Sequence, residues 1–203
     1  MKNLKYGEKA YTFDEYLVME EAAEYRSEYI NGNIIEMSGG SRNHSKISNS
    51  IGTAIDNEMI RMEKDCSFFN SDMKVYISKH NRGFYPDGMV VCGEEKVYKN
   101  NPNVLINPSL IIEVLSKSTR KDDKGDKFEL YRSLDSFKEY MLVWQTVPKV
   151  QTWYKEAPDL WRISSAFGLD KSIHLYSIDC DIALKDIYRV ATDLREEDYD
   201  GSW

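Results

Sequence analysis

The sequence predicts an α/β fold, of the mixed α+β kind, in which helices pack against a central β-sheet. Four apolar runs bounded by turn residues are the expected strands of this sheet: Phe68-Phe69, Lys74 to Ser78, Tyr85 to Cys92 and Leu110 to Leu115. A longer loop is expected around Asn100-Asn101-Pro102. Helix periodicity over Asp123 to Leu134 and a strand pattern at Glu139 to Val143 then follow. Because a strand, a helix and a strand succeed one another, we expect a buried parallel pairing with a right-handed crossover.

The amino-terminal region predicts a helix, a hairpin and a second, longer helix. Thr12-Phe13-Asp14-Glu15 has the pattern of a capping box, so a short helix is expected to begin there. Polarity alternates from Tyr25 to Met37 around Asn31-Gly32, a pair that tolerates positive φ, which indicates two antiparallel strands joined by a tight turn. From Ser41 to Met62 apolar residues recur at three- and four-residue spacing, which predicts a long helix against the sheet.

The carboxyl-terminal region predicts smaller elements. Gln151 to Tyr154 and Leu160 to Ser164 are typical of a hairpin, and Ala183 to Tyr188 of a short closing helix. Nothing in the composition divides the chain, so we expect one domain over residues 1–192. The acidic segment 193–203 is expected to be a flexible tail.

Composition narrows the class of protein. The formal net charge of −7 argues against holding nucleic acid by broad electrostatics. No apolar run approaches the roughly 18 to 20 residues that a membrane span needs, and Met1 to Lys5 lead into charged sequence, so we expect a cytoplasmic protein. Three widely spaced cysteines, Cys66, Cys92 and Cys180, predict reduced thiols rather than a disulfide framework or a zinc site.

The most informative position is Glu113, which lies within the apolar run Leu110 to Leu115. Such a strand is covered on both faces, so an ionised carboxylate there needs a cation or several hydrogen-bond donors. Asp87 opens another apolar run, and the two carboxylates can converge at one edge of the sheet. Hard oxygen ligands suit Mg²⁺ or Mn²⁺, together with waters and substrate phosphates. The pair therefore predicts a metal-dependent phosphodiester hydrolase.

Basic residues follow Glu113 along the chain: Lys117, Arg120, Lys121, Lys124 and Lys127. Because Asp122, Asp123 and Asp126 are interspersed among them, this stretch alone is typical of a solvated, mixed-charge helix face. One face of the predicted helix carries Asp123, Lys127 and Tyr131 at i, i+4 spacing. A long lysine side chain on that face can reach the end of the strand that carries Glu113.

These residues together resemble the Uma-type restriction endonuclease family, which belongs to the PD-(D/E)XK nuclease superfamily. The resemblance rests on the following residues and segments: Pro86-Asp87, Glu113 to Arg120, Asp123, Lys127, Tyr131, Tyr29 to Ser38, and His44. It extends over most of the chain, and little beyond about Val150 is diagnostic.

The resemblance implies a restriction-endonuclease-like mixed sheet flanked by helices, metal-dependent DNA cleavage and often a homodimer. Asp87 and Glu113 are the implied ligands of Mg²⁺ or Mn²⁺. The superfamily motif has a lysine two residues after the glutamate, but Leu115 stands there. Lys127 is the expected replacement, in support of the attacking water. Two further lysines are weaker candidates: Lys124 and Lys117.

The supporting residues each have a plainer interpretation. His44 is compatible with a metal or phosphate contact and equally with a hydrogen bond at the start of a helix. Glu36 could supply a third carboxylate, but an exposed strand charge is the favoured interpretation. Tyr131 is expected in the core with its hydroxyl near the site, and Asp87 alone could cap a turn.

Two function classes follow. In the first, the chain is a Mg²⁺-dependent endonuclease that uses Asp87, Glu113 and Lys127. In the second, it is a catalytically silent nucleic-acid-binding or scaffold protein, in which Glu113 forms a buried structural ion pair with Lys127 or Arg120. A metal-free acid/base hydrolase is disfavoured, because the surrounding basic residues would keep both acids ionised.

Overall fold

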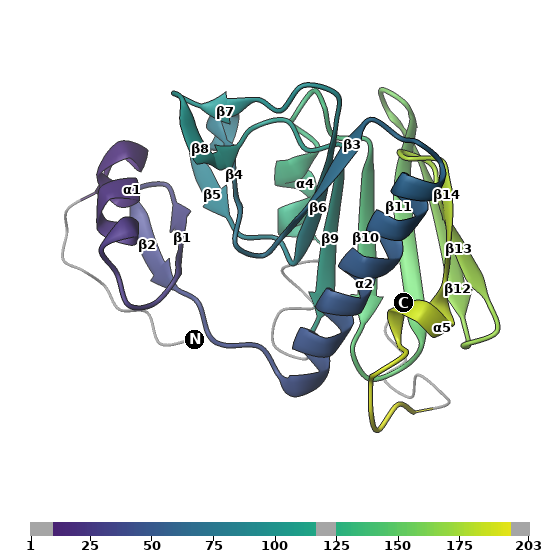
Figure 1. Cartoon of the computed structure of the whole chain (residues 1–203). Coiled ribbons are helices and arrows are strands. Elements are labelled where there is room, and N and C mark those ends of the chain that lie inside the picture. The colour runs from purple at the N-terminus through teal and green to yellow at the C-terminus, as the bar shows by residue number, and fades with distance from the viewer. Residues whose placement is uncertain (1–9, 117–124, 196–203) are drawn as a thin grey trace.

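The structure, a computed structural model, describes residues 10–116 and 125–195. This part of the chain forms two six-stranded sheets, a two-stranded hairpin and helices packed against them (Figure 1). The predicted mixed α+β fold is therefore confirmed. No helix among the described residues is both long and apolar enough to cross a membrane.

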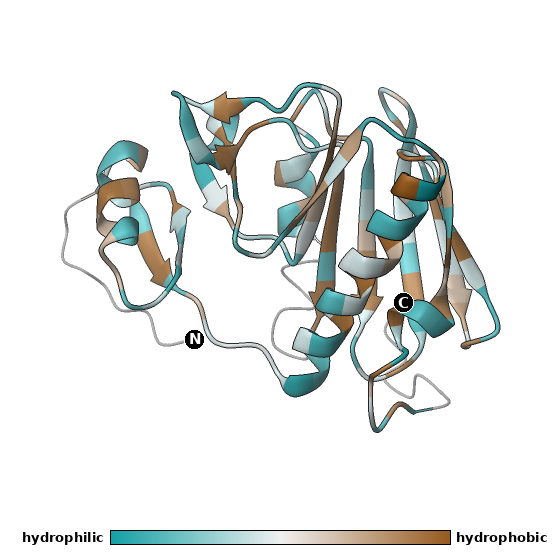
Figure 2. Cartoon of the chain, in the orientation of Figure 1, coloured by the Kyte–Doolittle hydropathy of each residue, from teal (hydrophilic) through white to brown (hydrophobic). Residues whose placement is uncertain are grey.

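The second sheet carries the runs that the sequence singled out. Its strand order is β12-β11-β10-β9-β6-β3. The bounds are β3 Cys66–Asn70, β6 Gly88–Cys92, β9 Leu110–Leu115, β10 Glu139–Trp144, β11 Lys149–Ala157 and β12 Leu160–Phe167. As predicted, β9 and β10 pair in parallel, and their connection contains α4 (Asp126–Tyr131). The hairpin β11–β12 is also confirmed, with longer strands than expected. Figure 2 shows hydrophobic colouring along β9, as its complete burial requires.

The first sheet has the strand order β2-β1-β5-β4-β8-β7. Its bounds are β1 Ser27–Ile30, β2 Asn33–Glu36, β4 Lys74–Ile77, β5 Arg82–Phe84, β7 Val97–Tyr98 and β8 Asn101–Leu105, and a 3₁₀ turn, η1 Ser78–His80, separates β4 from β5. The predicted hairpin is β1–β2, with Asn31 and Gly32 at φ 48° and 84° in its turn. The capping box is present, since the Glu15 backbone N–H donates to Thr12 Oγ1 and the Thr12 backbone N–H to the Glu15 carboxylate at the start of α1 (Phe13–Glu21).

The long helix α2 (Arg42–Arg61) covers one face of the second sheet (Figure 1). Its buried residues Ile47, Ile51, Ile55 and Met59 pack in one cluster with side chains of β6, β9 and β10. The opposite face of the sheet packs against α4 and the first sheet. Along β9, Ile112 and Val114 belong to the α2 cluster, whereas Ile111 and Leu115 belong to the other. By this alternation Glu113 faces α4 and the first sheet.

Two topological expectations are wrong, and one hairpin was missed. Lys74 to Ser78 was expected in the central sheet, but β4 lies in the first sheet, where it pairs in parallel with β8. The segment expected as a loop around Asn100-Asn101-Pro102 contains β8 itself. A hairpin of β13 (Ser172–Leu175) and β14 (Cys180–Ala183) precedes the confirmed short helix α5 (Leu184–Ile187) and was not predicted. The predicted tail lies largely outside the described residues, and the single-domain interpretation stays a prediction.

The expectation that the cysteines are all reduced is also wrong. Cys66 and Cys92 are directly opposite one another in the antiparallel pair β3–β6 and form a disulfide, while Cys180 is a buried free thiol. The prediction failed because strand register decides which cysteines meet, and spacing along the chain does not reveal it.

Candidate functional site

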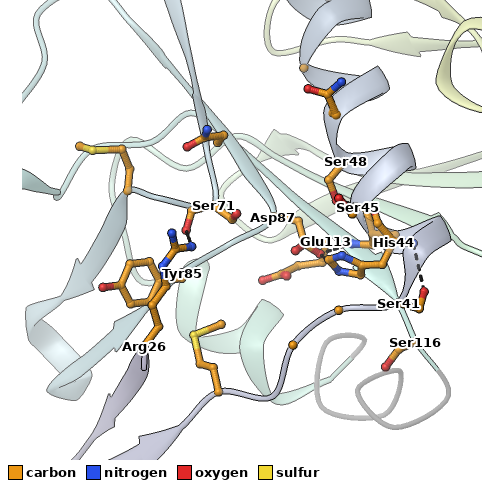
Figure 3. A pocket seen from close by; sticks show the side chains of 18 of the residues that line it. Arg26, Ser41, His44, Ser45, Ser48, Ser71, Tyr85, Asp87, Glu113 and Ser116 are labelled. Carbon is orange, nitrogen blue, oxygen red and sulfur yellow. Dashed lines mark hydrogen bonds and ion pairs between the residues drawn. The ribbon is translucent and has the colours of Figure 1, made fainter. Parts of the chain in front are cut away.

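A cleft of about 1300 Å³ lies where the first half of α2 and the amino-terminal hairpin approach the ends of β6 and β9. Figure 3 shows Ser41, His44, Ser45 and Ser48 along α2 on one side, and Arg26, Ser71 and Tyr85 on the other. Asp87 and Glu113 lie between these walls, next to His44 (Figure 3). The two carboxylates that the sequence predicted to converge do so at the base of this cleft.

The Asp87 carboxylate is held at the point where the β6–β9 ladder ends. Gly88 pairs with Ile112 in this antiparallel ladder, so Asp87 lies one step beyond, opposite Glu113. The Val114 backbone N–H donates to Asp87 Oδ2 at 2.7 Å, and His44 Nε2 lies 3.0 Å from the same oxygen. A backbone donor and an imidazole therefore fix the orientation of this carboxylate.

His44 reaches Asp87 because α2 begins beside it. Ser41 caps the helix by accepting a hydrogen bond from the His44 backbone N–H. Gly40 leaves room for the imidazole, since a Cβ there would lie 2.8 Å from His44 Nδ1. The hydrogen bond at the helix start is therefore present through the His44 backbone, the ring contacts Asp87, and a metal or phosphate contact stays a prediction.

Glu113 is 4% exposed and lies against residues of α4. The Tyr131 hydroxyl donates to Glu113 Oε1 at 3.3 Å, and Lys127 Nζ lies 3.5 Å from the same oxygen. The structure thus supplies the donor and the cation that a buried glutamate on this strand requires. Tyr131 is fully buried with its hydroxyl at the site, as the sequence predicted.

Lys127 also contacts the first sheet, which sequence reasoning missed. Its Nζ lies 3.4 Å from Glu28 Oε1 on β1 and 5.5 Å from the centre of the Phe84 ring on β5. Glu28 carries no local signal of this role, because the sequence shows only a charge in a half-exposed hairpin strand. Glu36 is the exposed strand charge that the sequence favoured, and it is not among the residues that line the cleft. Asp123, Lys124 and Lys117 lie outside the described residues.

A second glutamate in an apolar strand is held quite differently. Glu139, at the start of β10, is fully buried, and its Oε2 accepts hydrogen bonds from the backbone N–H and the hydroxyl of Ser177 at 2.8 Å each. Burial raises the pKa of Glu139, although the two donors from Ser177 oppose that shift. Glu139 does not line the cleft.

The donor set limits which metal ions fit the cleft. Within residues 10–116 and 125–195, no three His, Cys, Asp or Glu side chains converge as a metal-binding group. Two carboxylates on adjacent strands remain, and such a pair suits a Mg²⁺ or Mn²⁺ ion that completes its coordination with waters and substrate oxygens. It does not suit a structural zinc ion, which needs four protein ligands.

The fold is shared with a solved mixed α+β protein. It matches the crystal structure of a protein from Anabaena variabilis described as "a putative nuclease belonging to DUF820", with a TM-score of 0.69 at 19% sequence identity, over 88% of this chain and 98% of that one. At this identity the likeness concerns the fold.

The family follows from the sequence match. The chain belongs to the Uma2 family, described as "Putative restriction endonuclease", which matches residues 13–182 and confirms the resemblance found in the sequence. Two uncharacterized proteins from Synechocystis are similar to it. The protein sll1609 is 35% identical over 165 residues, which are 81% of this chain and 92% of the relative. The protein slr1290 is 34% identical over 176 residues, which are 87% and 90%.

Proposed function

We propose that this protein is a Mg²⁺- or Mn²⁺-dependent DNA endonuclease that hydrolyses phosphodiester bonds in the cleft between α2 and the amino-terminal hairpin. One observation carries the proposal: Asp87, oriented by His44 and the Val114 backbone N–H, lies opposite the buried Glu113 at the base of an open cleft. The fold alone does not require two adjacent carboxylates at a cleft. A hard divalent ion binds such a pair.

Each side chain has a role in the proposed chemistry. Asp87 and Glu113 would hold the metal, which would polarise the attacking water and neutralise charge developing on the phosphate. His44 keeps Asp87 aimed into the cleft. Lys127 places its ammonium beside Glu113, where it supports the attacking water and stabilises the anionic transition state. Tyr131 holds the Glu113 carboxylate by donating a hydrogen bond to it.

A homodimer on DNA is part of the proposal. The described lining residues include four carboxylates, of Glu24, Asp56, Asp87 and Glu113, against two basic side chains, of Arg26 and Lys127. The described lining therefore offers little positive charge to a phosphate backbone, and a homodimer could supply more. Sedimentation with and without DNA tests this proposal. A monomer that binds DNA with the same affinity as a dimer contradicts it.

A cytoplasmic location also belongs to the proposal, although the disulfide is more typical of oxidising compartments.

The test of the proposed activity is cleavage of supercoiled plasmid and single-stranded DNA with Mg²⁺ or Mn²⁺. Cleavage that stops with chelator, with Asp87→Asn and with Glu113→Gln supports the proposal. Glu139→Gln is the matched control, because it replaces a buried glutamate on the adjacent strand away from the cleft. Loss of cleavage in Glu139→Gln as well would trace the effect to the fold.

The contact between Lys127 and Glu113 also favours a second candidate, a catalytically silent nucleic-acid-binding or scaffold protein in which these residues form a structural ion pair. Calorimetry with Mn²⁺ separates the two. An endonuclease site binds Mn²⁺ and loses it in Glu113→Gln, whereas the silent protein binds none.

A further inference from the structure

The Lys127 ammonium is shared between two carboxylates that come from different sheets. Its Nζ lies 3.4 Å from Glu28 Oε1 and 3.5 Å from Glu113 Oε1. Both distances exceed the roughly 2.7–2.9 Å of a charge-assisted hydrogen bond. Among the described residues, the ammonium is therefore at nearly the same distance from Glu28 as from Glu113.

Glu28 occupies this position because of strand register. Tyr29 pairs with Gly83 in the β1–β5 ladder, so Glu28 lies opposite Phe84, whose ring also contacts the Lys127 ammonium. The hairpin that carries Glu28 is anchored at its base, where the Arg26 guanidinium donates to the Ser71 carbonyl and pairs with Asp72. The first sheet thus presents a carboxylate and an aromatic face together to α4.

The environment makes this contact stronger than one at the surface. The side chains of Glu28 and Lys127 are each 17% exposed, and that of Glu113 is 5% exposed.

We propose that Glu28 is a positioning residue that holds the Lys127 ammonium at the edge of Glu113 and so keeps the Glu113 carboxylate available to a divalent metal ion. The second half of this inference rests on the proposed function. When Glu28 is lost, the ammonium moves toward Glu113 and competes with the metal for that carboxylate. The role of Glu28 is thus exerted through Lys127, without contact to substrate or metal.

The first test needs neither metal nor activity. A double-mutant cycle of Glu28→Gln and Lys127→Met is measured by urea unfolding in chelator. We expect a coupling of at least fivefold in the unfolding equilibrium constant. A coupling below twofold overturns the inference, whatever the protein is found to catalyse.

The second test is calorimetric titration with Mn²⁺. We expect Glu28→Gln to weaken Mn²⁺ binding about tenfold, Glu28→Asp to restore it to within threefold, and the loss to fall below twofold in the Lys127→Met background. A merely structural role for Glu28 would not depend on Lys127 in this way. Glu36→Gln is the matched control, because it removes an equal charge from the same hairpin at an exposed position outside the cleft.

The outcomes separate the inference from the proposed function. Unchanged Mn²⁺ affinity in Glu28→Gln, or a tenfold loss that persists without Lys127, overturns the positioning role toward the metal. If the wild-type protein binds no Mn²⁺, the proposed function fails, and the metal-free coupling alone decides whether Glu28 positions Lys127.

Discussion

Replacing Glu113 with glutamine separates a metal ligand from a structural ion pair by its effect on stability. Two unit charges 3.5 Å apart attract by about 5 kcal/mol at an effective dielectric constant of about 20. Burying a carboxylate that is 4% exposed costs several kcal/mol, which offsets this attraction. Glutamine keeps an acceptor for the Tyr131 hydroxyl, and Lys127 keeps Glu28 at 3.4 Å. We therefore expect the free energy of unfolding to change by less than about 1 kcal/mol.

The assay is urea unfolding of wild type and Glu113→Gln in chelator, followed by calorimetry with Mn²⁺. We expect nearly equal unfolding free energies and loss of Mn²⁺ binding in the variant. A loss of about 3–5 kcal/mol, the usual result of breaking a buried ion pair, would instead mean that the Lys127 contact contributes net stability. A loss of that size, with no Mn²⁺ bound by wild type, would refute the metal-ligand role.

Three further predictions concern the rest of the fold. Cys66 and Cys92, which form the disulfide between β3 and β6, are 26 positions apart in the sequence. Reduction is therefore expected to lower the unfolding free energy by about 3.5 kcal/mol. Thiol titration of the denatured protein should find one free thiol without reductant and three with it. Because burial raises the pKa of Glu139, the native state binds the carboxyl proton more readily than the unfolded chain does. The free energy of unfolding should therefore rise as pH falls from the folded-state pKa of Glu139 toward its unfolded-state pKa. Urea unfolding of Glu139→Gln should lack this pH-dependent stabilisation. Gly40→Ala should displace the His44 ring and reduce DNA cleavage about tenfold, whereas Gly39→Ala, where a Cβ meets nothing within 4 Å, should not.

Sequence patterns predicted the elements whose signals are local. The capping box at Thr12 and the Asn31-Gly32 turn each involve residues a few positions apart, and both are present. The long helix is confirmed between Ser41 and Met62, with Ile47 and Met59 buried in its apolar face, although Met62 itself is 40% exposed. These elements need no knowledge of distant partners.

What the sequence did not reveal depends on pairing between distant segments. The parallel contact of β4 with β8 joins Lys74 to Val104, and no local pattern identifies that partner. The same holds for the disulfide and for Glu28, which reaches Lys127 only because β1 pairs with β5. Register, more than element type, therefore limited the prediction of the site.

Register also distinguishes two glutamates that look alike in the sequence. β9 and β10 are parallel, with Glu139 opposite Leu110 and Glu113 opposite Leu142, so the two carboxylates lie about 10 Å apart along the strands. Glu139 is held by fixed neutral donors of Ser177, which satisfy one of its oxygens without any mobile charge. Glu113 instead faces a lysine ammonium on a flexible side chain, which lies 3.5 Å from it and also contacts Glu28. A carboxylate whose cationic partner can move away is open to a metal ion, and this difference is why we propose the chemistry at Glu113.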